Sequence, residues 1–318
     1  MKRTVSIVGA GRVGRTLGKR LREHGWRIGA VVTRSAASAR AAVRTIGAGT
    51  PLAGLSALGR ISSRGGSAGL QPRGYRLTHK GASAPGIAAV FAADLILFAT
   101  PDDALPAVAE ALAKMAGSAW RGKIALHTSA TLDRSVLAPL ARLGAATGSL
   151  HPMQAFGGEI VPKLDGVIFA IEGDAKARRM ARSIAKSLGG IPIAIHTRDK
   201  PVYHATAVIA AGSTYATTET GLRMLMRIGF SRVQAMQTLV PLMRQIVDNI
   251  ERIGPRSAWT GPLSRADYAI VAKHARALRR FPREIQRAYA ALSLLAGRVL
   301  AKNPNAALKK IERALAAR

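Results

Sequence analysis

The sequence predicts an α/β fold in which a doubly wound, mostly parallel sheet is followed by an all-α C-terminal domain. Two observations predict it. Short apolar runs alternate with helical patterns in the first two-thirds of the chain, and only helical patterns follow Thr197. Near-continuous apolar strands separated by helices are typical of a parallel sheet covered on both faces. The expected strands span residues 5–8, 28–33, 95–100, 123–128, 167–171 and 191–197.

Capping signals predict where the clearest helices begin and end. Asp174 is a natural N-cap for a helix that Gly189 ends. Ser231 caps a later helix, in which Pro241 predicts a kink. The other expected helices span about 13–23, 103–114, 132–142, 199–227, 264–279, 283–300 and a basic final segment.

These patterns divide the chain into a sheet domain at residues 1–198 and a helical domain at residues 199–318. The helical domain is expected to contribute to the substrate site and, because its helices are apolar, to form a homodimer. Residues 57–85 are rich in Gly, Ser and Arg and lack an apolar period, so they are expected to be an insertion in the first domain.

The charge is strongly positive, with 48 Lys and Arg against 17 Asp and Glu. Such an excess can indicate nucleic acid, an acidic surface or an anionic substrate. Here the cations are spread over nearly every segment, and aromatic residues make up only 4% of the chain, so stacking platforms for single strands are scarce. A nucleic-acid-associated protein is therefore the alternative and not the main expectation.

Several site classes are excluded by composition. The chain has no cysteine, which excludes disulfides, thiolate metal sites and cysteine nucleophiles. No apolar run approaches the roughly 18 residues of a membrane helix. His151 has no neighbouring carboxylates or second histidine at ligand spacing, so no metal is expected. We expect a cytoplasmic protein without a membrane segment.

The strongest chemical motif is a glycine turn near the N-terminus. Gly9, Gly11 and Gly14 have G-x-G-x-x-G spacing, follow a predicted strand and open a predicted helix. This context predicts a Rossmann-type site in which backbone N–H groups face a pyrophosphate. Arg12 adds positive potential to the loop, and Val13 belongs to it. Residues 1–198 are therefore expected to bind a dinucleotide.

The end of the second strand predicts which nucleotide binds. Sites for NAD usually carry Asp or Glu about 20 residues after the last glycine, where it binds the ribose 2′-hydroxyl. Arg34 occupies this position here, between Thr33 and Ser35. A guanidinium can hold a 2′-phosphate in a forked contact. The sequence therefore favours NADP over NAD.

Two more strands end in polar residues where the nicotinamide half of a cofactor would lie. Thr100 and Pro101 are expected to line the cofactor, and Asp102 to cap the helix that follows. The His-Thr-Ser segment at residues 127–129 is expected at the rim of the cleft, with Ser129 on the cofactor.

Five motifs occur in order along the chain: IVGAGRVGRTLG, HTSA, SLHPMQAF, DKPVYHATAVIAAG and WTGPLSRAD followed by KH. Together they resemble a bacterial family of Rossmann-like proteins whose C-terminal half is a domain of unknown function. That family is similar to a branch of the 6-phosphogluconate-dehydrogenase-like superfamily, near ketopantoate reductase and pyrroline-carboxylate reductase. The resemblance implies NADP-dependent reduction of a carbonyl or imine on a small carboxylate such as ketopantoate.

The last predicted strand is followed by a helix start that carries Lys200 and His204, one turn apart on one face. By analogy with the superfamily, Lys200 is the proton donor or the carboxylate clamp, and His204 is its partner or the donor itself. For His151, a structural hydrogen-bonding role is an equal alternative. The expected substrate-binding residues are His151, Gln154, Ser264 and Arg265.

One departure from the family pattern supports another function. Relatives carry a Ser-Asn pair shortly after this helix start, whereas Ala211 and Gly212 stand here. The loss of an asparagine able to bind substrate leaves a non-catalytic NADP sensor as a further alternative.

Overall fold

The computed structural model describes residues 3–54, 84–158 and 160–317. The chain divides into two compact units, residues 1–211 and 212–318, which are described separately. The domain boundary expected at residue 198 stays a prediction. The insertion expected at residues 57–85 lies, up to residue 83, outside the described residues.

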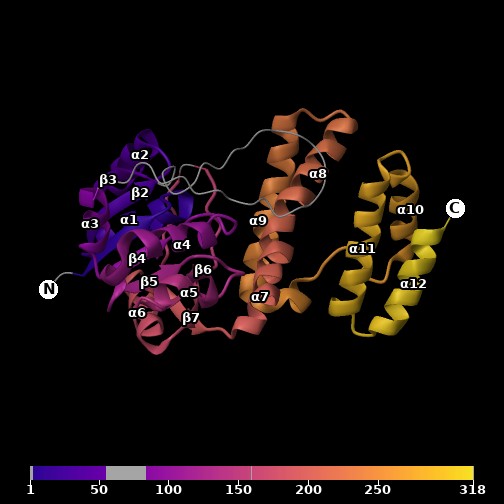
Figure 1. Ribbon diagram of the computed structural model, residues 1–318. Coiled ribbons are helices and arrows are strands. Elements are labelled where there is room, and N and C mark those ends of the chain that lie inside the picture. Colours follow the sequence, from indigo (N-terminus) through magenta and orange to yellow (C-terminus); the bar gives the residue numbers. More distant parts are fainter. Residues whose placement is uncertain (1–2, 55–83, 159, 318) are drawn as a thin grey trace, which may run out of the picture. The chain divides into compact units, whose positions relative to one another are not determined.

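The first unit contains an eight-stranded sheet with the order β3-β2-β1-β4-β5-β6-β7-β8 (Figure 1). All neighbouring strands are parallel except β6 and β7, which are antiparallel. The strands are β1 Thr4–Val8, β2 Arg27–Thr33, β3 Thr50–Ala53, β4 Leu95–Phe98, β5 Ile124–His127, β6 Ala146–Pro152, β7 Ile168–Gly173 and β8 Ile191–Ala194. The prediction of a doubly wound, mostly parallel sheet is confirmed.

Helices cover both faces of this sheet. One face packs against α1 (Arg12–Glu23), α2 (Ala36–Ile46) and α6 (Ala175–Ser187). The other face packs against α3 (Ala84–Phe91), α4 (Leu105–Ala116), the 3₁₀ turn η2 (Arg134–Leu137) and α5 (Ala138–Ala141). The unit also contains the 3₁₀ turns Gly117–Trp120 and Thr197–Asp199, and α7 (Lys200–Ala207).

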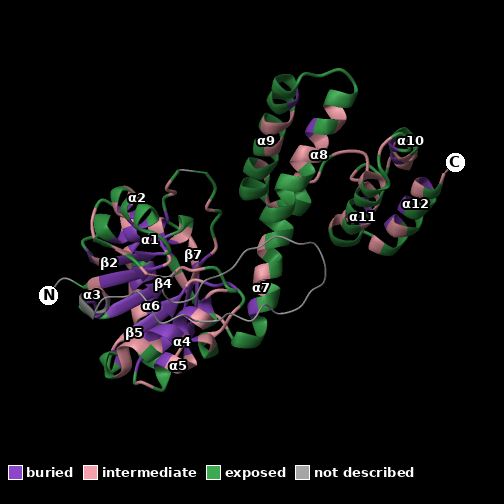
Figure 2. Ribbon diagram, turned by 45° about the horizontal axis from the view of Figure 1, so that its top comes forward, coloured by how far each residue is buried: buried purple, intermediate pink, exposed green. Residues whose placement is uncertain are grey.

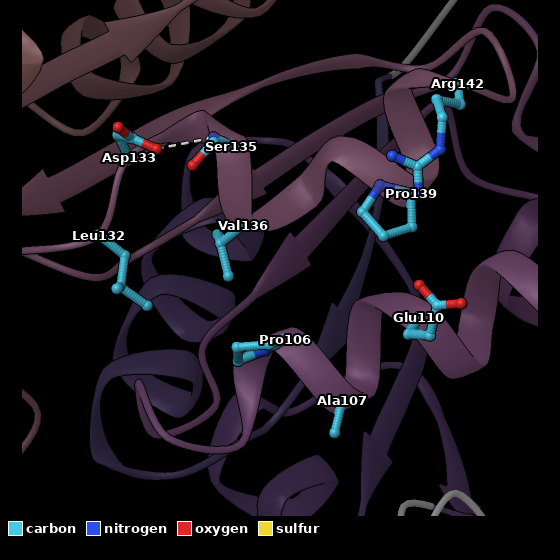
Figure 3. Close-up of a pocket in the computed structure, with 9 residues that line it drawn as sticks. All are labelled: Pro106, Ala107, Glu110, Leu132, Asp133, Ser135, Val136, Pro139 and Arg142. Atoms are coloured by element: carbon cyan, nitrogen blue, oxygen red, sulfur yellow. Dashed lines mark hydrogen bonds between the residues drawn. The ribbon is translucent and has the colours of Figure 1, made fainter. Parts of the chain in front are cut away.

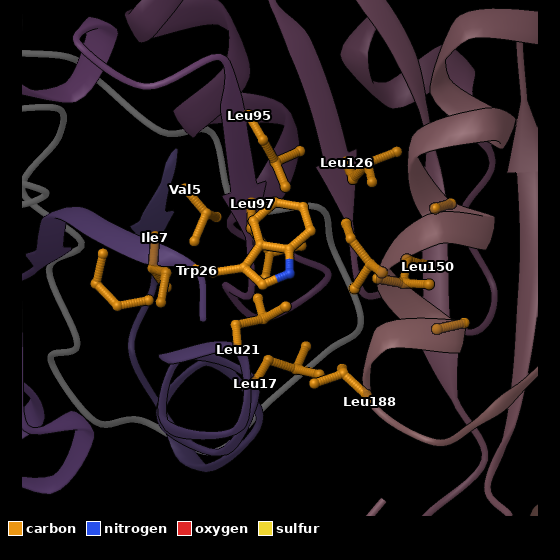
Figure 4. Packing of buried hydrophobic residues seen from close by; sticks show 14 of the residues in the cluster. Val5, Ile7, Leu17, Leu21, Trp26, Leu95, Leu97, Leu126, Leu150 and Leu188 are labelled. Carbon is orange, nitrogen blue, oxygen red and sulfur yellow. The ribbon is translucent and has the colours of Figure 1, made fainter. Parts of the chain in front are cut away.

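Alternation along the strands separates two hydrophobic clusters. In β4, Leu95 and Leu97 enter the cluster with α1 and α6, whereas Ile96 and Phe98 enter the cluster with α4. Figure 4 shows the first cluster, where Trp26 packs among leucines from the strands and from α1. The site residues are therefore carried by a sheet that is buried on both faces (Figure 2).

Four elements were missed from the sequence: α2, α3, β3 and β6. Residues 149–152, which the sequence did not assign to a strand, belong to β6. A glycine and polar residues hid this strand. A Cβ atom added to Gly148 would lie 2.5 Å from the backbone oxygen of Glu172 on β7, so the close approach of β6 and β7 requires glycine here.

The second unit is helical, as predicted. It contains α8 (Ser213–Arg227), α9 (Arg232–Ala258), α10 (Tyr268–Leu278), α11 (Arg283–Leu300) and α12 (Pro304–Ala316). The N-caps at Asp174 and Ser231 are confirmed, and Ser231 forms a complete capping box. Pro241 lies inside α9, whose backbone leaves helical geometry instead at Gly254. No helix in the described ranges is long and apolar enough to cross a membrane.

We predict that Gly148→Ala destabilises the protein by about 1–3 kcal/mol, because the new methyl group overlaps the β7 backbone. Urea unfolding followed by circular dichroism measures the change. Gly157→Ala is the matched control, since an added Cβ meets nothing within 4 Å there, and its effect should stay within about 0.5 kcal/mol. Equal stability of the two variants would contradict the packing argument.

Candidate active site

The three motif glycines have different surroundings. Gly9 has a φ of 89°, and a Cβ atom there would lie 2.6 Å from the backbone nitrogen of Thr100. A Cβ atom on Gly14 would lie 2.5 Å from the Gly9 oxygen. A Cβ atom on Gly11 would meet nothing within 4 Å. Gly9 therefore allows the loops after β1 and β4 to touch, and Gly14 allows the first turn of α1 to pack against Gly9. Gly11 presents bare backbone to open space.

The loops at the carboxyl ends of β1 and β4, called the cofactor edge below, carry hydrogen-bonding groups without a partner among the described residues. Gly11 is the N-cap of α1 and offers no side-chain bond, and the first turn carries no acidic residue. The buried hydroxyl oxygen of Thr100 has no partner among the described residues. Buried hydroxyls are nearly always bonded, so a bound molecule would complete this one. The residues present fit the pyrophosphate of a dinucleotide.

Arg12 joins this edge to the segment after β6. Its Nη1 donates to the backbone oxygen of Phe156 over 3.2 Å. Gln154, in the same segment, is exposed, and its Oε1 accepts from the neighbouring Ala155 backbone N–H. The SLHPMQAF motif thus places its second half beside the glycine loop.

The end of β2 holds the second predicted cofactor contact. Ser35 is the N-cap of α2 and accepts from the Ser38 backbone N–H at 3.2 Å. The Thr33 hydroxyl donates to the Ser35 backbone oxygen at 2.8 Å. Arg34 lies exposed between them. The contacts of Thr33 and Ser35 fix the backbone on both sides of Arg34 at the start of α2.

Lys200 is buried, with only 2% of its surface exposed, and its Nζ donates to the Ser149 hydroxyl over 2.9 Å. Burial lowers the pKa of Lys200, while the charges of Glu172, Asp133 and Asp102 act in the opposite direction. The ammonium group therefore lies inside the first unit, close to three carboxylates.

The sheet register explains why these groups meet. Pairing places Phe98, His127, Ser149 and Glu172 side by side on β4, β5, β6 and β7. Neighbours in register point to the same face of a sheet. Glu172 is 8% exposed, and its Oε2 accepts from the Arg134 backbone N–H at 3.0 Å. Burial raises the pKa of Glu172, and Lys200 opposes that effect.

His127 has a structural position. The Ser129 backbone N–H donates to its Nδ1 at 3.2 Å, so Nε2 carries the proton and donates to the Asp133 backbone oxygen at 3.1 Å. Burial, together with the charge of Lys200, lowers the pKa of His127 to about 4. The expectation that His127 lies at the rim of the cleft is wrong, because its ring is fully buried.

Asp102 does not cap the helix that follows it, which corrects the prediction. Ala104 is the N-cap of α4. The Asp102 carboxylate instead accepts from the hydroxyls of Ser129 at 2.7 Å and Thr131 at 2.9 Å. It thereby ties the loop after β4, which carries Thr100 and Pro101, to the loop after β5.

His151 pairs with a tyrosine that the sequence analysis did not assign to the site. Its Nδ1 lies 3.2 Å from the Tyr203 hydroxyl, and the rings meet edge to face with centroids 5.6 Å apart. Burial, with the charges of His204 and Lys200, lowers the pKa of His151 to about 4. Burial raises the pKa of Tyr203 to about 12. Both groups are therefore neutral near pH 7, and a single hydrogen bond joins them.

His204 lies one turn beyond Lys200 on α7 and is half-buried. Its Nδ1 is buried without a hydrogen-bond partner in the part of the chain that the structure describes. Ser264 and Arg265 belong to the second unit, in a turn before α10, where the Ser264 hydroxyl donates to the Gly261 oxygen at 2.8 Å. Their assignment to the substrate stays a prediction.

A separate hollow of about 680 Å³ lies between α4 and the η2–α5 segment (Figure 3). Asp133 is at its edge, where its carboxylate accepts from the Ser135 backbone N–H at 2.8 Å. None of the predicted site residues lines it. The lining residues are Pro106, Ala107, Glu110, Leu132, Asp133, Ser135, Val136, Pro139 and Arg142.

Glu172 and Asp133 are candidate-site residues that sequence reasoning missed, and Ser149 and Tyr203 lay within predicted motifs without an assigned role. One signal was available for Glu172, which is the only charged residue in the strand Ile168–Gly173. Ser149, Asp133 and Tyr203 have partners far along the chain or through the backbone, so their contacts could not be inferred from a local pattern.

Two sequence patterns and several solved structures are similar to this chain. A Rossmann-like domain matches residues 76–152, and a domain of unknown function, DUF2520, matches residues 167–296. No curated protein sequence matches the chain.

The similar structures cover nearly the whole chain. One is a protein from Bacteroides fragilis designated an NADP oxidoreductase, with 18% identity, coverage of 97% of this chain and 98% of that chain, and a TM-score of 0.68. A reductive aminase from Aspergillus terreus, in complex with NADPH and ethyl-5-oxohexanoate, has 15% identity, coverage of 97% and 99%, and a TM-score of 0.62. An imine reductase from Streptomyces aurantiacus has 14% identity, coverage of 96% and 99%, and a TM-score of 0.55. At these identities the similarity concerns the fold.

We predict that the protein loses stability as the pH falls from about 6.5 to about 4. The lowered pKa values of His127 and His151 mean that the unfolded chain takes up protons in this range before the folded chain does. His127→Asn should make the dependence shallower by up to about 1.4 kcal/mol per pH unit, because asparagine does not titrate and its Oδ1 can still accept from the Ser129 N–H. Urea unfolding at a series of pH values tests this, and equal slopes would contradict it.

Proposed function

We propose that the chain is an NADP-dependent oxidoreductase that reduces a carbonyl or imine group of a small molecule. The observation that carries the proposal is found after the paired strands β1 and β4: Gly11 offers bare backbone in the first loop, and the Thr100 hydroxyl lacks a partner in the second. The similar structures support it, since one is a reductive aminase in complex with NADPH and another is an imine reductase. Fold similarity alone does not carry a function, so the residues below do.

The proposed cofactor residues surround the cofactor edge. The amide groups at the start of α1 would bind the pyrophosphate, and Arg34 the 2′-phosphate that distinguishes NADP from NAD. Thr100, Pro101 and Ser129 would meet the nicotinamide half, because they follow β4 and β5 at their carboxyl ends. The remaining proposed contacts come from Arg12, Val13, Thr33 and Ser35.

When bound, the cofactor would supply a hydride to the substrate carbon. The protein must then provide a proton and stabilise the charge that develops on the oxygen or nitrogen. His204 is the proposed proton donor, because its Nδ1 is buried and unpartnered. The Tyr203–His151 pair would fix one wall of the site.

Lys200 would act differently from His204. Its ammonium is buried and bonded to Ser149, so it does not present a free donor at the surface. In the proposal it supplies positive charge near the developing anion and holds the first turn of α7 against β6. This favours electrostatic stabilisation over direct proton donation.

The finer proposal for the substrate is a small carboxylate such as a 2-oxo acid of the ketopantoate type or a cyclic imine of the pyrroline type. Arg265 is the proposed carboxylate contact, with Ser264, His151 and Gln154. This rests on the resemblance of the motifs that carry these residues. Neutral His151 would serve as a hydrogen-bonding group.

A homodimer is also proposed. Large apolar side chains on α8, α9 and α11 are exposed, and monomeric proteins rarely expose apolar patches of that extent. A second copy of the chain would cover them. They include Met226, Val233, Met236, Leu242, Ile246, Val247, Ile250, Leu292, Leu295 and Val299.

We predict that Arg34→Ala weakens NADPH binding by about 10- to 100-fold and leaves NADH binding unchanged, because only NADPH carries the 2′-phosphate. Isothermal titration calorimetry with both nucleotides measures this. Arg44→Ala is the matched control, an exposed arginine at the other end of α2. Equal affinity of the unaltered protein for NADH and NADPH would contradict the assignment.

We predict that Lys200→Met and His204→Asn each lower kcat by about 100-fold or more, with NADPH affinity within about twofold of the unaltered protein. NADPH oxidation is followed with ketopantoate, other 2-oxo acids, cyclic imines, and ketones with amines. Lys186→Met, at an exposed lysine of α6, is the control.

Two results would decide against this proposal. Unchanged rates in both variants would contradict the assigned roles. Tight NADPH binding without turnover on any substrate class would contradict the enzymatic proposal and favour a sensor, in line with Ala211 and Gly212 in place of the Ser-Asn pair.

A further inference from the structure

Glu172 is a buried carboxylate that the proposed reaction does not yet use. It lies near the end of β7, in a strand that is otherwise apolar or glycine. A carboxylate removed from water is costly unless it is hydrogen-bonded and near positive charge. Both conditions hold here, through the Arg134 backbone N–H and the nearby Lys200 ammonium.

The strand register brings Glu172 to Lys200. Ser149 and Glu172 are directly paired across β6 and β7, and Lys200 bonds to the Ser149 hydroxyl. Among the described residues no direct ion pair joins Lys200 to Glu172, so the two groups act on each other across Ser149. Glu172 has the largest effect among the carboxylates that favour the charged form of Lys200.

Glu172 also fixes the β5 loop, residues 128–134. Its bond to the Arg134 N–H holds the C-terminal end of this loop, and His127 binds both ends, through the Ser129 N–H and the Asp133 backbone oxygen. Between these two anchors the Ser129 hydroxyl is bonded to Asp102. The β5 loop is therefore held against the proposed cofactor edge by buried groups on β5 and β7.

We propose that Glu172 is a positioning residue for the site: it keeps the Lys200 ammonium charged where it bonds to Ser149 of β6, and it holds the β5 loop against the loop after β4. The catalytic part of this statement rests on the proposed function. The charge and loop contacts do not, so they can be tested without turnover.

Several titratable groups surround Lys200. They are Glu172 on β7, Asp133 and His127 at the β5 loop, Asp102 after β4, and His151 on β6. Removing the Glu172 charge leaves the buried ammonium with less compensation. Lys200 would then release its proton at lower pH than in the unaltered protein.

Glu172→Gln tests the charge alone, because the glutamine oxygen can still accept from the Arg134 N–H. In protein labelled with ¹⁵N-lysine, the buried Lys200 ammonium is assigned by its loss in Lys200→Met and followed by NMR as the pH is raised. We expect it to titrate at lower pH in Glu172→Gln. Glu110→Gln, which removes a surface carboxylate paired with Lys114 on α4, should leave the titration unchanged.

An unchanged Lys200 titration in Glu172→Gln would overturn the inference, whether or not a substrate is found. If the chain turns over a substrate, the same variant should lower kcat about tenfold, move the alkaline limb of the pH–rate profile to lower pH, and leave the NADPH Kd unchanged. An unshifted profile would overturn the catalytic part. Absence of turnover by the unaltered protein would contradict the proposed function alone.

If Glu172→Gln does not fold, the double variant Glu172→Gln, Lys200→Met decides the question. Removing both charges takes away the uncompensated ammonium, so the double variant should recover folding. Failure to recover would overturn the pairing of the two groups.

Discussion

The bond from the Lys200 ammonium to the Ser149 hydroxyl is the contact on which the candidate site depends. It attaches the first turn of α7 to β6 and places a positive charge in a buried interior. Such a charge is tolerated only with compensation, which Glu172, Asp133 and Asp102 provide. The same three carboxylates also form hydrogen bonds that hold the loops after β4 and β5. The groups that compensate the buried Lys200 charge therefore also fix the shape of the candidate site.

The second constraint is the contact between the loops after β1 and β4. Only glycine at position 9 allows it, and it leaves Gly11 and the Thr100 hydroxyl available to a ligand. Both constraints lie at the carboxyl ends of the parallel strands, where open α/β sheets bind ligands. In the proposed function, the cofactor would bind at this end of the sheet, and Lys200, Tyr203 and His204 of α7 would serve hydride transfer to a small substrate.

Local signals were enough to predict six of the eight strands, the glycine turn and the caps at Asp174 and Ser231, because apolar runs, glycine spacing and capping residues are local patterns. The β6 strand was missed, since Gly148 serves an approach to β7 that no local pattern reveals. Asp102 and Lys200 were singled out, but their partners lie 27 and 51 residues away, so their contacts could not be inferred. Glu172 acquires its importance only from the register of β6 with β7.

A crystal structure of the chain with NADPH tests the central claim most directly. The account predicts the pyrophosphate against the backbone at Gly11, a hydrogen bond to the Thr100 hydroxyl, the 2′-phosphate at Arg34, and Lys200 still bonded to Ser149. Binding of NADPH away from the Gly11 edge, or a Lys200 side chain released from Ser149 into solvent, would contradict it.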